Sequence, residues 1–167
     1  MSRTKTDWKR LVRREIQASL KIVVLGVGNK ARGDDAAGLI CAESIKKATR
    51  GKARSRLRVL LGREVPENWT GIIRKIGPDL VLILDAGAGP YRPGTIFLVE
   101  KDALADEGVS THKISLALFV RYLEETVGCK TIILGIQPGK NDFGSSLSLP
   151  VKKAVQKLSE YFASLMA

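Results

Sequence analysis

Two uninterrupted apolar runs constrain the fold of this chain more than any other feature. KIVVLGVG occupies residues 21–28 and DLVLILDAG occupies residues 79–87. Runs of this length, without polar alternation, are typical of strands that are buried on both faces of a parallel sheet. Weaker strand patterns, bounded by turn residues, occur at 56–62, 94–100 and 131–136. The sequence therefore predicts a sheet built around buried strands.

Helical patterns alternate with these strands. They cover residues 8–20, 35–49, 113–126 and 150–165. VPENW (65–69) is a turn that leads into a further short helix ending near Gly77. This alternation predicts an α/β sandwich with a mostly parallel sheet. The link between 79–87 and 94–100 is too short for a parallel crossover, so 94–100 should run antiparallel to the strand before it.

The length of 167 residues suits one domain. We expect residues 1–20 to form an N-terminal amphipathic helical extension, with Trp8 and Leu20 on its apolar side, and residues 21–167 to form a single α/β domain. No apolar run approaches the roughly 20 residues that span a bilayer, and the N-terminus lacks the apolar stretch of a secretory signal. A cytoplasmic monomer without membrane insertion is the expectation.

The positive charge of the chain raises the question of a polyanionic partner. The net charge is +11, and a run of eight basic side chains without an acidic one lies between residues 46 and 63. Basic charge at a helix end and along a sheet edge also has structural causes, namely the helix dipole and protection against edge pairing. Aromatic residues make up only 5% of the chain. A solvated basic face is therefore the first interpretation, an acidic protein partner the second, and RNA the third.

The chain offers few groups for nucleophilic catalysis. His112 is the only histidine, and Cys41 and Cys129 are predicted to be buried, reduced thiols. A serine nucleophile needs a base. Ser115 lies three residues after His112, but nothing marks it as an activated nucleophile. Two aspartates that share a proton would leave His112 without a role.

The segment GVGNKARGDDAAG, residues 26–38, begins like a phosphate-binding glycine loop. Its spacing fits G-x-G-x-x-[GA], the fingerprint in which a helix starts at the loop and its amide groups bind a pyrophosphate. Here Arg32 and Gly33 interrupt the pattern, and the carboxylates of Asp34 and Asp35 occupy the place of the anion. The loop is therefore better suited to a cation than to a nucleotide.

Several polar residues are expected at one edge of the predicted sheet, beyond the carboxyl ends of the parallel strands, where ligands bind. Asp34 and Asp35 follow the first strand, and Asp85 ends the third. His112 starts the helix that feeds the last parallel strand. Carboxylates and an imidazole suit a divalent transition metal, and three protein ligands leave coordination positions open. Taken singly, each of these residues also has a structural interpretation, such as a helix cap.

Six segments of the chain, in order, resemble the [NiFe] hydrogenase maturation endopeptidases, in particular the HycI-like type. They are GVGNKARGDDAAG (26–38), PENWTG (66–71), DLVLILDAGAGPYRPGTI (79–96), STHKISL (110–116), GIQPG (135–139) and FGSSLSLPV (143–151). The resemblance runs from about residue 21 to residue 160. It implies a three-layer α/β sandwich with a twisted five-stranded, mostly parallel sheet, one antiparallel strand and helices on both faces.

The resemblance also implies a metal-dependent endopeptidase that removes the C-terminal extension of a [NiFe] hydrogenase large-subunit precursor. Members of the family act after nickel insertion, and the nickel in the precursor is thought to serve for recognition. The family's metal-binding and catalytic residues correspond to Asp35, Asp85 and His112. Asp34 corresponds to the first acid of the pair, usually not counted as a ligand, and we expect it to cap the following helix.

Three further residues are expected to form a substrate loop beside these groups. Asn29 would shape the turn after the first strand, and Gly87 and Gly89 lie in a segment expected to be flexible enough to accommodate the substrate chain. The resemblance implies that the metal is nickel supplied by the precursor and that other divalent cations can substitute for it. The partner is the large-subunit precursor, and no nucleic acid is expected.

Two regions depart from the family pattern. The helix over 8–20 is an extension that many members lack, and it either covers a face of the sheet or serves as a docking element. The basic run over 46–63 is heavier than the family would suggest. It supports an alternative function, a non-catalytic basic binding module for RNA or for an acidic protein partner.

Overall fold

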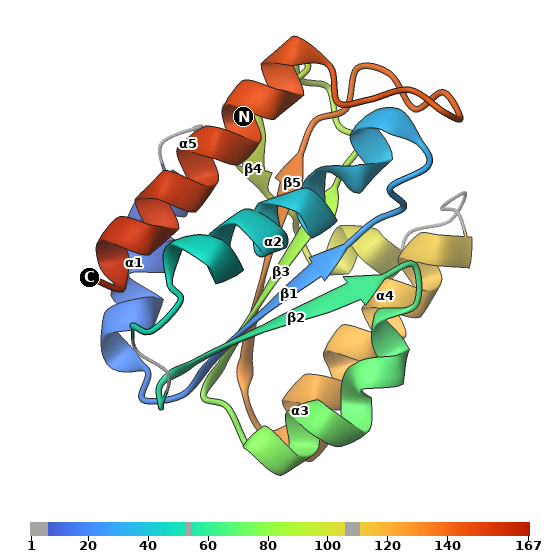
Figure 1. Ribbon diagram of the computed structural model, residues 1–167. Helices are drawn as coiled ribbons and strands as arrows, with labels where there is room; N and C mark the ends of the chain where they lie inside the picture. Colours follow the sequence, from blue (N-terminus) through green and yellow to red (C-terminus); the bar gives the residue numbers. More distant parts are fainter. Residues whose placement is uncertain (1–6, 53–54, 106–110) are drawn as a thin grey trace.

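A five-stranded sheet forms the centre of the molecule (Figure 1). The computed structural model describes residues 7–52, 55–105 and 111–167, without the side chains of residues 7, 105 and 111–114. The strands are β1 (Ile22–Val27), β2 (Leu57–Arg63), β3 (Leu80–Ala86), β4 (Ile96–Leu98) and β5 (Lys130–Ile136). Their order is β2-β1-β3-β5-β4, with every neighbouring pair parallel except β4 and β5. The predicted mostly parallel sheet with one antiparallel strand is confirmed.

Helices cover both faces of this sheet and complete the three layers. α1 (Asp7–Ala18), α2 (Ala37–Ala48) and α5 (Leu149–Leu165) lie on one face, and α3 (Thr70–Ile76) and α4 (Thr111–Tyr122) lie on the other. Shorter helical turns occur at Gly33–Ala36, Pro66–Trp69, Asp102–Ala105 and Leu123–Val127. Within the described residues, no helix is long and apolar enough to cross a membrane.

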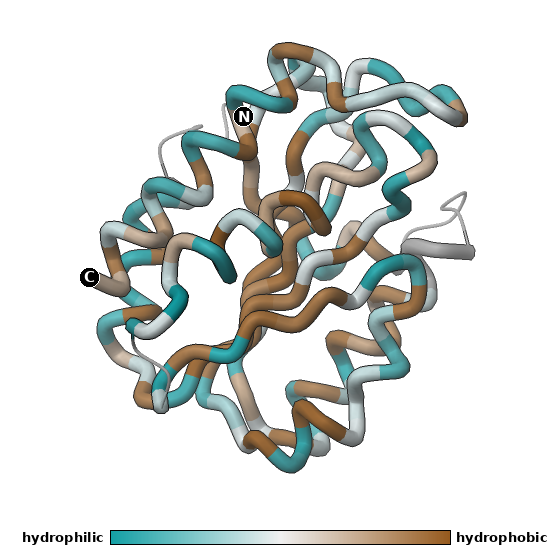
Figure 2. Tube along the Cα trace, in the orientation of Figure 1, coloured by the Kyte–Doolittle hydropathy of each residue, from teal (hydrophilic) through white to brown (hydrophobic). Residues whose placement is uncertain are grey.

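The core consists of two apolar clusters separated by the sheet, because successive side chains of each strand point to opposite faces. Figure 2 shows the strands as a continuous hydrophobic band through the middle of the molecule. The side chains of Trp8, Val12 and Ile16 are buried in the same cluster as those of α2 and α5. The described part of the N-terminal helix therefore covers a sheet face. Residues 1–6 of the predicted extension lie outside the described residues.

Several element boundaries differ from the prediction, among them those of α1, α2 and β4. α1 ends at Ala18, and the side chain of Leu20, expected on the apolar side of that helix, is 81% exposed. The chain leaves the helix here, since the Asp79 carboxylate accepts hydrogen bonds from the backbone N–H groups of the two residues before β1. The helix predicted over 35–49 starts with a 3-10 turn and becomes α-helical at Ala37. β4 is short, and it pairs with β5 rather than with β3.

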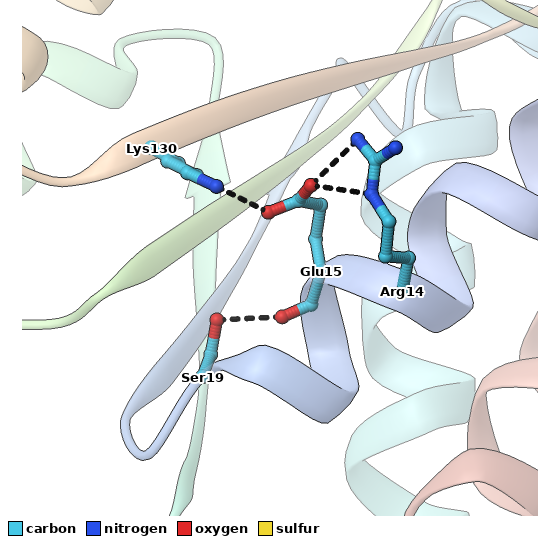
Figure 3. Close-up of polar contacts among 4 residues, drawn as sticks. All are labelled: Arg14, Glu15, Ser19 and Lys130. Atoms are coloured by element: carbon cyan, nitrogen blue, oxygen red, sulfur yellow. Dashed lines mark hydrogen bonds and ion pairs between the residues drawn. The ribbon is translucent and has the colours of Figure 1, made fainter.

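A buried carboxylate fastens α1 to the amino end of the sheet (Figure 3). The side chain of Glu15 is 8% exposed, and its oxygens lie 2.9 Å from Nζ of Lys130 at the start of β5 and 2.8 Å from Nη2 of Arg14. The hydroxyl of Ser19 donates to the Glu15 carbonyl oxygen, 2.7 Å away. The hydrogen bonds from Lys130 and Arg14 lower the pKa of Glu15 below its ordinary value, against the effect of burial. The helix and β5 are thus joined through one charged group.

Candidate active site

The loop after β1 presents Asp35 at the carboxyl end of the sheet. Gly28 has a φ of +149°, and a Cβ there would lie 2.2 Å from the Asp35 carbonyl oxygen, so this close approach requires glycine. The backbone N–H of Asn29 donates to Oδ2 of Asp35 at 3.2 Å, and Oδ1 of Asn29 accepts from Ala31 N at 2.8 Å. Asn29 therefore supports the turn that presents Asp35, while its place in a substrate loop stays a prediction.

The carboxylate of Asp35 retains capacity to accept further hydrogen bonds or a cation. Within the described residues, the bond from Asn29 is its single hydrogen bond, and the residue is half-buried. An ionised carboxylate has about four acceptor positions on its two oxygens. Among the residues that the structure describes, no donor occupies most of these positions, which lie at the carboxyl end of the sheet.

Asp34, the other acid of the pair, is fully buried and its acceptor positions are filled. Oδ2 accepts from the N–H groups of Gly139 and Lys140, both at 2.8 Å, and from the Ser148 hydroxyl at 2.7 Å. Oδ1 accepts from Ser148 N at 2.7 Å. Burial by itself would raise the pKa of Asp34, but these hydrogen bonds outweigh it and lower the pKa. The carboxylate is thereby held in its ionised form.

The prediction that Asp34 caps the helix after it is wrong. Asp34 lies inside the 3-10 turn Gly33–Ala36, and neither this turn nor α2 has a side-chain cap. Its carboxylate instead accepts from the loop that connects β5 to α5, where Ser148 is the N-cap residue of α5. The partners lie 105 to 114 residues further along the chain, so no local pattern reveals them.

The loop after β1 and the loop before α5 form one hydrogen-bonded unit. Gly33 N donates to the Ser145 carbonyl oxygen at 3.2 Å, and Gly144 N donates to the Ala31 carbonyl oxygen at 2.7 Å. A Cβ at Gly33, where φ is +51°, would lie 2.4 Å from the Ser145 hydroxyl oxygen. Sequence reasoning missed this role of the second loop. The only sign of it was the presence of FGSSLSLPV among the segments that resemble the family.

Asp85 is the next-to-last residue of β3 and is 8% exposed. It lies at the carboxyl end of the strand, opposite Gly135 of β5. The alternation of side chains puts it on the same face as Val81 and Ile83, which pack in the cluster that includes α4. The predicted site residue is therefore buried at the expected edge, on the side of the sheet that α4 covers.

Contact with Gly38 brings the Asp35 turn against β3. A Cβ on Gly38, in the first turn of α2, would lie 2.1 Å from the Leu84 carbonyl oxygen and 2.6 Å from the Val27 carbonyl oxygen. The helix therefore starts directly on the ends of β1 and β3, and the turn that contains Asp35 contacts β3. The structure thus brings Asp35 and Asp85 to the same end of two adjacent strands.

His112 is the second residue of α4, which begins at Thr111. This backbone position at the helix start is the predicted one, and the side chain lies outside the described residues. Among the residues that the structure describes, no three His, Cys, Asp or Glu residues are grouped closely enough to hold a metal ion. The ligand set of Asp35, Asp85 and His112 therefore stays a prediction.

The predicted substrate segment around Gly87 and Gly89 is held by hydrogen bonds to β5 and to the residue that follows it. Gly87 N donates to the Ile136 carbonyl oxygen at 3.1 Å. Gly89 N donates to Oε1 of Gln137 at 2.7 Å, and Gln137 is 9% exposed. Sequence reasoning did not single out Gln137, although it lies in the GIQPG segment. A buried amide that accepts from Gly89 fixes the course of this segment, which differs from the flexibility expected of it, and its place beside the substrate stays a prediction.

Neither cysteine is suited to act as a nucleophile. Cys41 and Cys129 are free and buried, as the sequence predicts. Burial raises the pKa of the Cys41 thiol to about 12 and that of the Cys129 thiol to about 11. Because the thiolate is the reactive form, both side chains are inert near neutral pH. Peptide-bond cleavage by a cysteine mechanism is therefore not available to this site.

A hollow of about 530 Å³ lies between α4 and the turn that follows β2. Ser115, Leu118 and Val65 contribute to its lining. The side chains of Leu118 and Val65 are 63% and 48% exposed, which is unusual for aliphatic residues that share a concave surface. The hollow starts one turn after His112, on the face of the sheet that α4 covers.

Comparison with known proteins identifies the family. The family model described as hydrogenase maturation protease (HycI) matches residues 40–164. The chain belongs to the hydrogenase maturation protease family. The hydrogenase 3 maturation protease of Escherichia coli K12 is 36% identical over 135 residues, which cover 80% of this chain and 83% of that protein.

Solved structures of other members of the hydrogenase maturation protease family have the same fold. The crystal structure of the [NiFe] hydrogenase maturation protease HycI from Thermococcus kodakarensis superposes with a TM-score of 0.83 at 30% identity, covering 93% of this chain and 98% of that one. The solution structure of the endopeptidase HycI from Escherichia coli superposes with a TM-score of 0.73 at 31% identity, covering 86% and 90%. The chain is thus an endopeptidase of the hydrogenase maturation type.

Proposed function

We propose that the protein removes the C-terminal extension from the large-subunit precursor of a [NiFe] hydrogenase after nickel has been inserted. In this proposal Asp35, Asp85 and His112 bind the nickel that the precursor carries, so the metal is part of the substrate. Asn29, Gly87 and Gly89 border the bound chain. The enzyme is expected to act in the cytoplasm as a monomer.

The contrast between the two acids of the loop carries this proposal. Asp34 has its acceptor positions filled by three backbone N–H groups and a hydroxyl, whereas Asp35 receives a single hydrogen bond from the residues that the structure describes. The carboxylate of Asp34 thus stabilises the loop, and the carboxylate of Asp35 remains available to a ligand. Asp85 lies at the same end of the adjacent strand. Two carboxylates and an imidazole are donors that a nickel ion accepts.

The chain's own residues would position the substrate. Carboxylates at the ends of β1 and β3 and an imidazole at the start of α4 bind the substrate's metal, which fixes the neighbouring peptide bond at this edge. A metal ion held in this way polarises a carbonyl group or a water molecule. The ordered segment around Gly89 and the hollow beside α4 flank the path that the bound chain would follow.

The alternative of a non-catalytic basic binding module has less support. It rests on the basic run over 46–63 alone, whereas the family model and the relatives at 30% identity or more are all proteases. A basic surface on a protease can also attract an acidic substrate. The basic run is therefore better regarded as a part of an enzyme than as the function of the chain.

The test is tail removal from a nickel-loaded large-subunit precursor, followed by mass spectrometry. Wild type should release the extension from nickel-loaded precursor and leave nickel-free precursor intact. Asp35→Asn, Asp85→Asn and His112→Gln should each slow release by at least about a hundredfold. Asp142→Asn is the matched control, because Asp142 is an exposed carboxylate in the loop next to the site. The Asp142→Asn protein should cleave the precursor at the wild-type rate.

If nickel-free precursor is cleaved at the same rate as nickel-loaded precursor, recognition of nickel by the enzyme is disproved. Release at the wild-type rate by all three substituted proteins would show that the assigned residues do not carry the reaction. Binding of the precursor without any release, by wild type, would instead indicate a chaperone of the nickel step.

A further inference from the structure

The β2 groove, a basic groove of about 690 Å³, lies between the C-terminal half of α2 and the edge strand β2. Lys30 lines it at the end near the candidate site, next to Asn29, and is linked to α2 through an ion pair of 2.6 Å with Glu43. Further cations line it along α2 and the turn after it, namely Lys46, Lys47, Arg50 and Lys52. Residues 53–54 of the predicted basic run lie outside the described residues.

The charge of this groove exceeds what the fold itself requires. Lys46 and Lys47 lie in the last turn of α2, where they complement the helix dipole. Arg50 and Lys52 lie in the turn after the C-cap Thr49, where the effect of the dipole falls off. Within the described residues, these four exposed side chains form no ion pair. Glu43 is the single acid among the described residues that line the groove, against six basic side chains, so the excess positive charge favours an anionic partner.

The floor of the β2 groove is apolar and borders an open edge of the sheet. The side chains of Leu57 and Val59 point toward α2, the first buried and the second half-buried. β2 is the outermost strand of the described sheet and is paired on one side by β1. An extended chain can add to such an edge through backbone hydrogen bonds, with its side chains on the groove. The groove thus offers main-chain pairing, an apolar floor and a basic rim together.

We propose that the β2 groove binds an acidic, extended segment of the protein substrate, at a distance from the bond that is cut. The identity of that substrate rests on the proposed function, whereas the acidic chemistry rests on the groove. Because Lys30 lines the groove and Asn29 borders Asp35, a chain held there leads directly to the candidate site. The groove would raise the affinity for the precursor without taking part in the reaction.

A polypeptide fits this surface better than single-stranded RNA does. Proteins that bind single-stranded nucleic acid stack the bases on aromatic side chains. No aromatic side chain lines the β2 groove in the described part of the chain. The apolar floor of Leu57 and Val59 suits aliphatic side chains instead. RNA is therefore the competing occupant that the experiment must separate from an acidic peptide.

The test compares two triple charge reversals. K46E/K47E/K52E changes the groove, and K152E/K153E/K157E makes the same change of charge on exposed lysines of α5. Dissociation constants for the labelled precursor and steady-state kinetics of tail release are measured for both. We expect the groove variant to raise the dissociation constant and KM about tenfold with kcat unchanged, and the α5 variant to match wild type.

Two further measurements make the result decisive. K46Q/K47Q/K52Q repeats the change without placing acids at the end of α2, and its smaller effect must run in the same direction. Poly-glutamate should compete with the precursor for wild type and lose this effect in the groove variant. Competition by poly-uridylate that exceeds that of poly-glutamate would assign the groove to RNA and overturn the proposal.

The outcomes also separate this proposal from the proposed function. Weaker binding of the precursor by the groove variant supports the groove even if wild type releases no extension, in which case the proposed function fails alone. Normal tail release by wild type together with equal binding by both triple variants overturns the groove and leaves the proposed function intact.

Discussion

Carboxylates at the two ends of the sheet differ in how completely they are used. At the amino end, Glu15 is paired with Lys130, and Asp79 accepts two backbone hydrogen bonds of 2.8 Å. At the carboxyl end, Asp34 accepts four hydrogen bonds, but its neighbour Asp35 accepts a single bond of 3.2 Å from the described part of the chain. At the amino end, both carboxylates are bonded to other parts of the chain. At the carboxyl end, Asp34 is bonded in this way, and Asp35 keeps acceptor positions that no described residue fills.

This difference indicates how to distinguish a structural acid from a working one. A carboxylate whose acceptor positions are filled by distant parts of the chain stabilises the fold, and it has no free acceptor position for a ligand. A carboxylate in the same loop with open positions costs little to the fold and remains available to a cation. Position in the sheet alone does not separate the two, since Asp34 and Asp35 are adjacent in sequence.

Removal of Asp34 should have the largest effect on stability. Asp34→Ala leaves three backbone N–H groups and the Ser148 hydroxyl without their acceptor, and should lower the free energy of unfolding by about 4 kcal/mol. Urea denaturation measures this. Asp142→Ala, in an exposed position of the neighbouring loop, should change it by less than about 0.5 kcal/mol. A loss below about 1 kcal/mol for Asp34→Ala would contradict a structural role.

A methyl group at Gly38 should have the next largest effect, because it would force α2 away from the Leu84 carbonyl oxygen. We expect Gly38→Ala to cost about 3 kcal/mol by urea denaturation and to reduce tail release by displacing Asp35. Gly71→Ala is the control. Gly71 lies in α3 with no atom within 4 Å of an added Cβ, so alanine should stabilise the protein by about 0.5 to 1 kcal/mol.

The amino end should prove more tolerant. Glu15→Gln removes the ion pairs with Lys130 and Arg14, whose side chains are both 71% exposed, so the expected loss is about 1 kcal/mol with tail release unchanged. Glu125→Gln, which breaks the exposed pair with Arg121, should cost about 0.3 kcal/mol. If Glu15→Gln slows tail release without a change in stability, the assignment of a purely structural role to the amino end of the sheet is wrong.

Acid should lower the stability that the carboxylates at both ends of the sheet contribute. The folded-state pKa values of Asp34 and Glu15 are lowered from 3.8 and 4.5. The stability that each group contributes is therefore present above those values and is lost as the pH falls through the lowered ones. Unfolding free energy measured against pH should decline below about pH 4.5, less steeply in Glu15→Gln. If the unfolding free energy of Glu15→Gln falls with pH as steeply as that of wild type, Glu15 does not contribute to the loss of stability in acid.

The architecture was predictable because buried parallel strands leave an unmistakable local pattern. The runs at 21–28 and 79–87 correspond to β1 and β3, and the topology alone assigns Asp35 and Asp85 to one edge. The short link before 94–100 predicts the antiparallel direction of β4. It does not reveal that β5, formed later in the chain, inserts between β3 and β4.

The contacts of single side chains were less predictable, because they depend on residues far away in sequence. Asp34 is a residue type that often caps helices, and it stands at a position where a cap is expected. Only the folded structure shows that its carboxylate accepts a hydrogen bond from Ser148 instead. Leu20 completes an apolar stripe, yet Asp79 ends the helix before it. Gln137 carries no local mark of its hydrogen bond to Gly89.

The rate at which Asp35→Asn removes the tail from nickel-loaded precursor tests the central claim most directly. The substitution keeps the shape of the side chain and its hydrogen bond from Asn29 N, but it removes the charge that would bind the metal. We predict a rate at least about a hundredfold below wild type, with an unfolding free energy within about 1 kcal/mol of it. Tail release by Asp35→Asn at the wild-type rate would contradict the account.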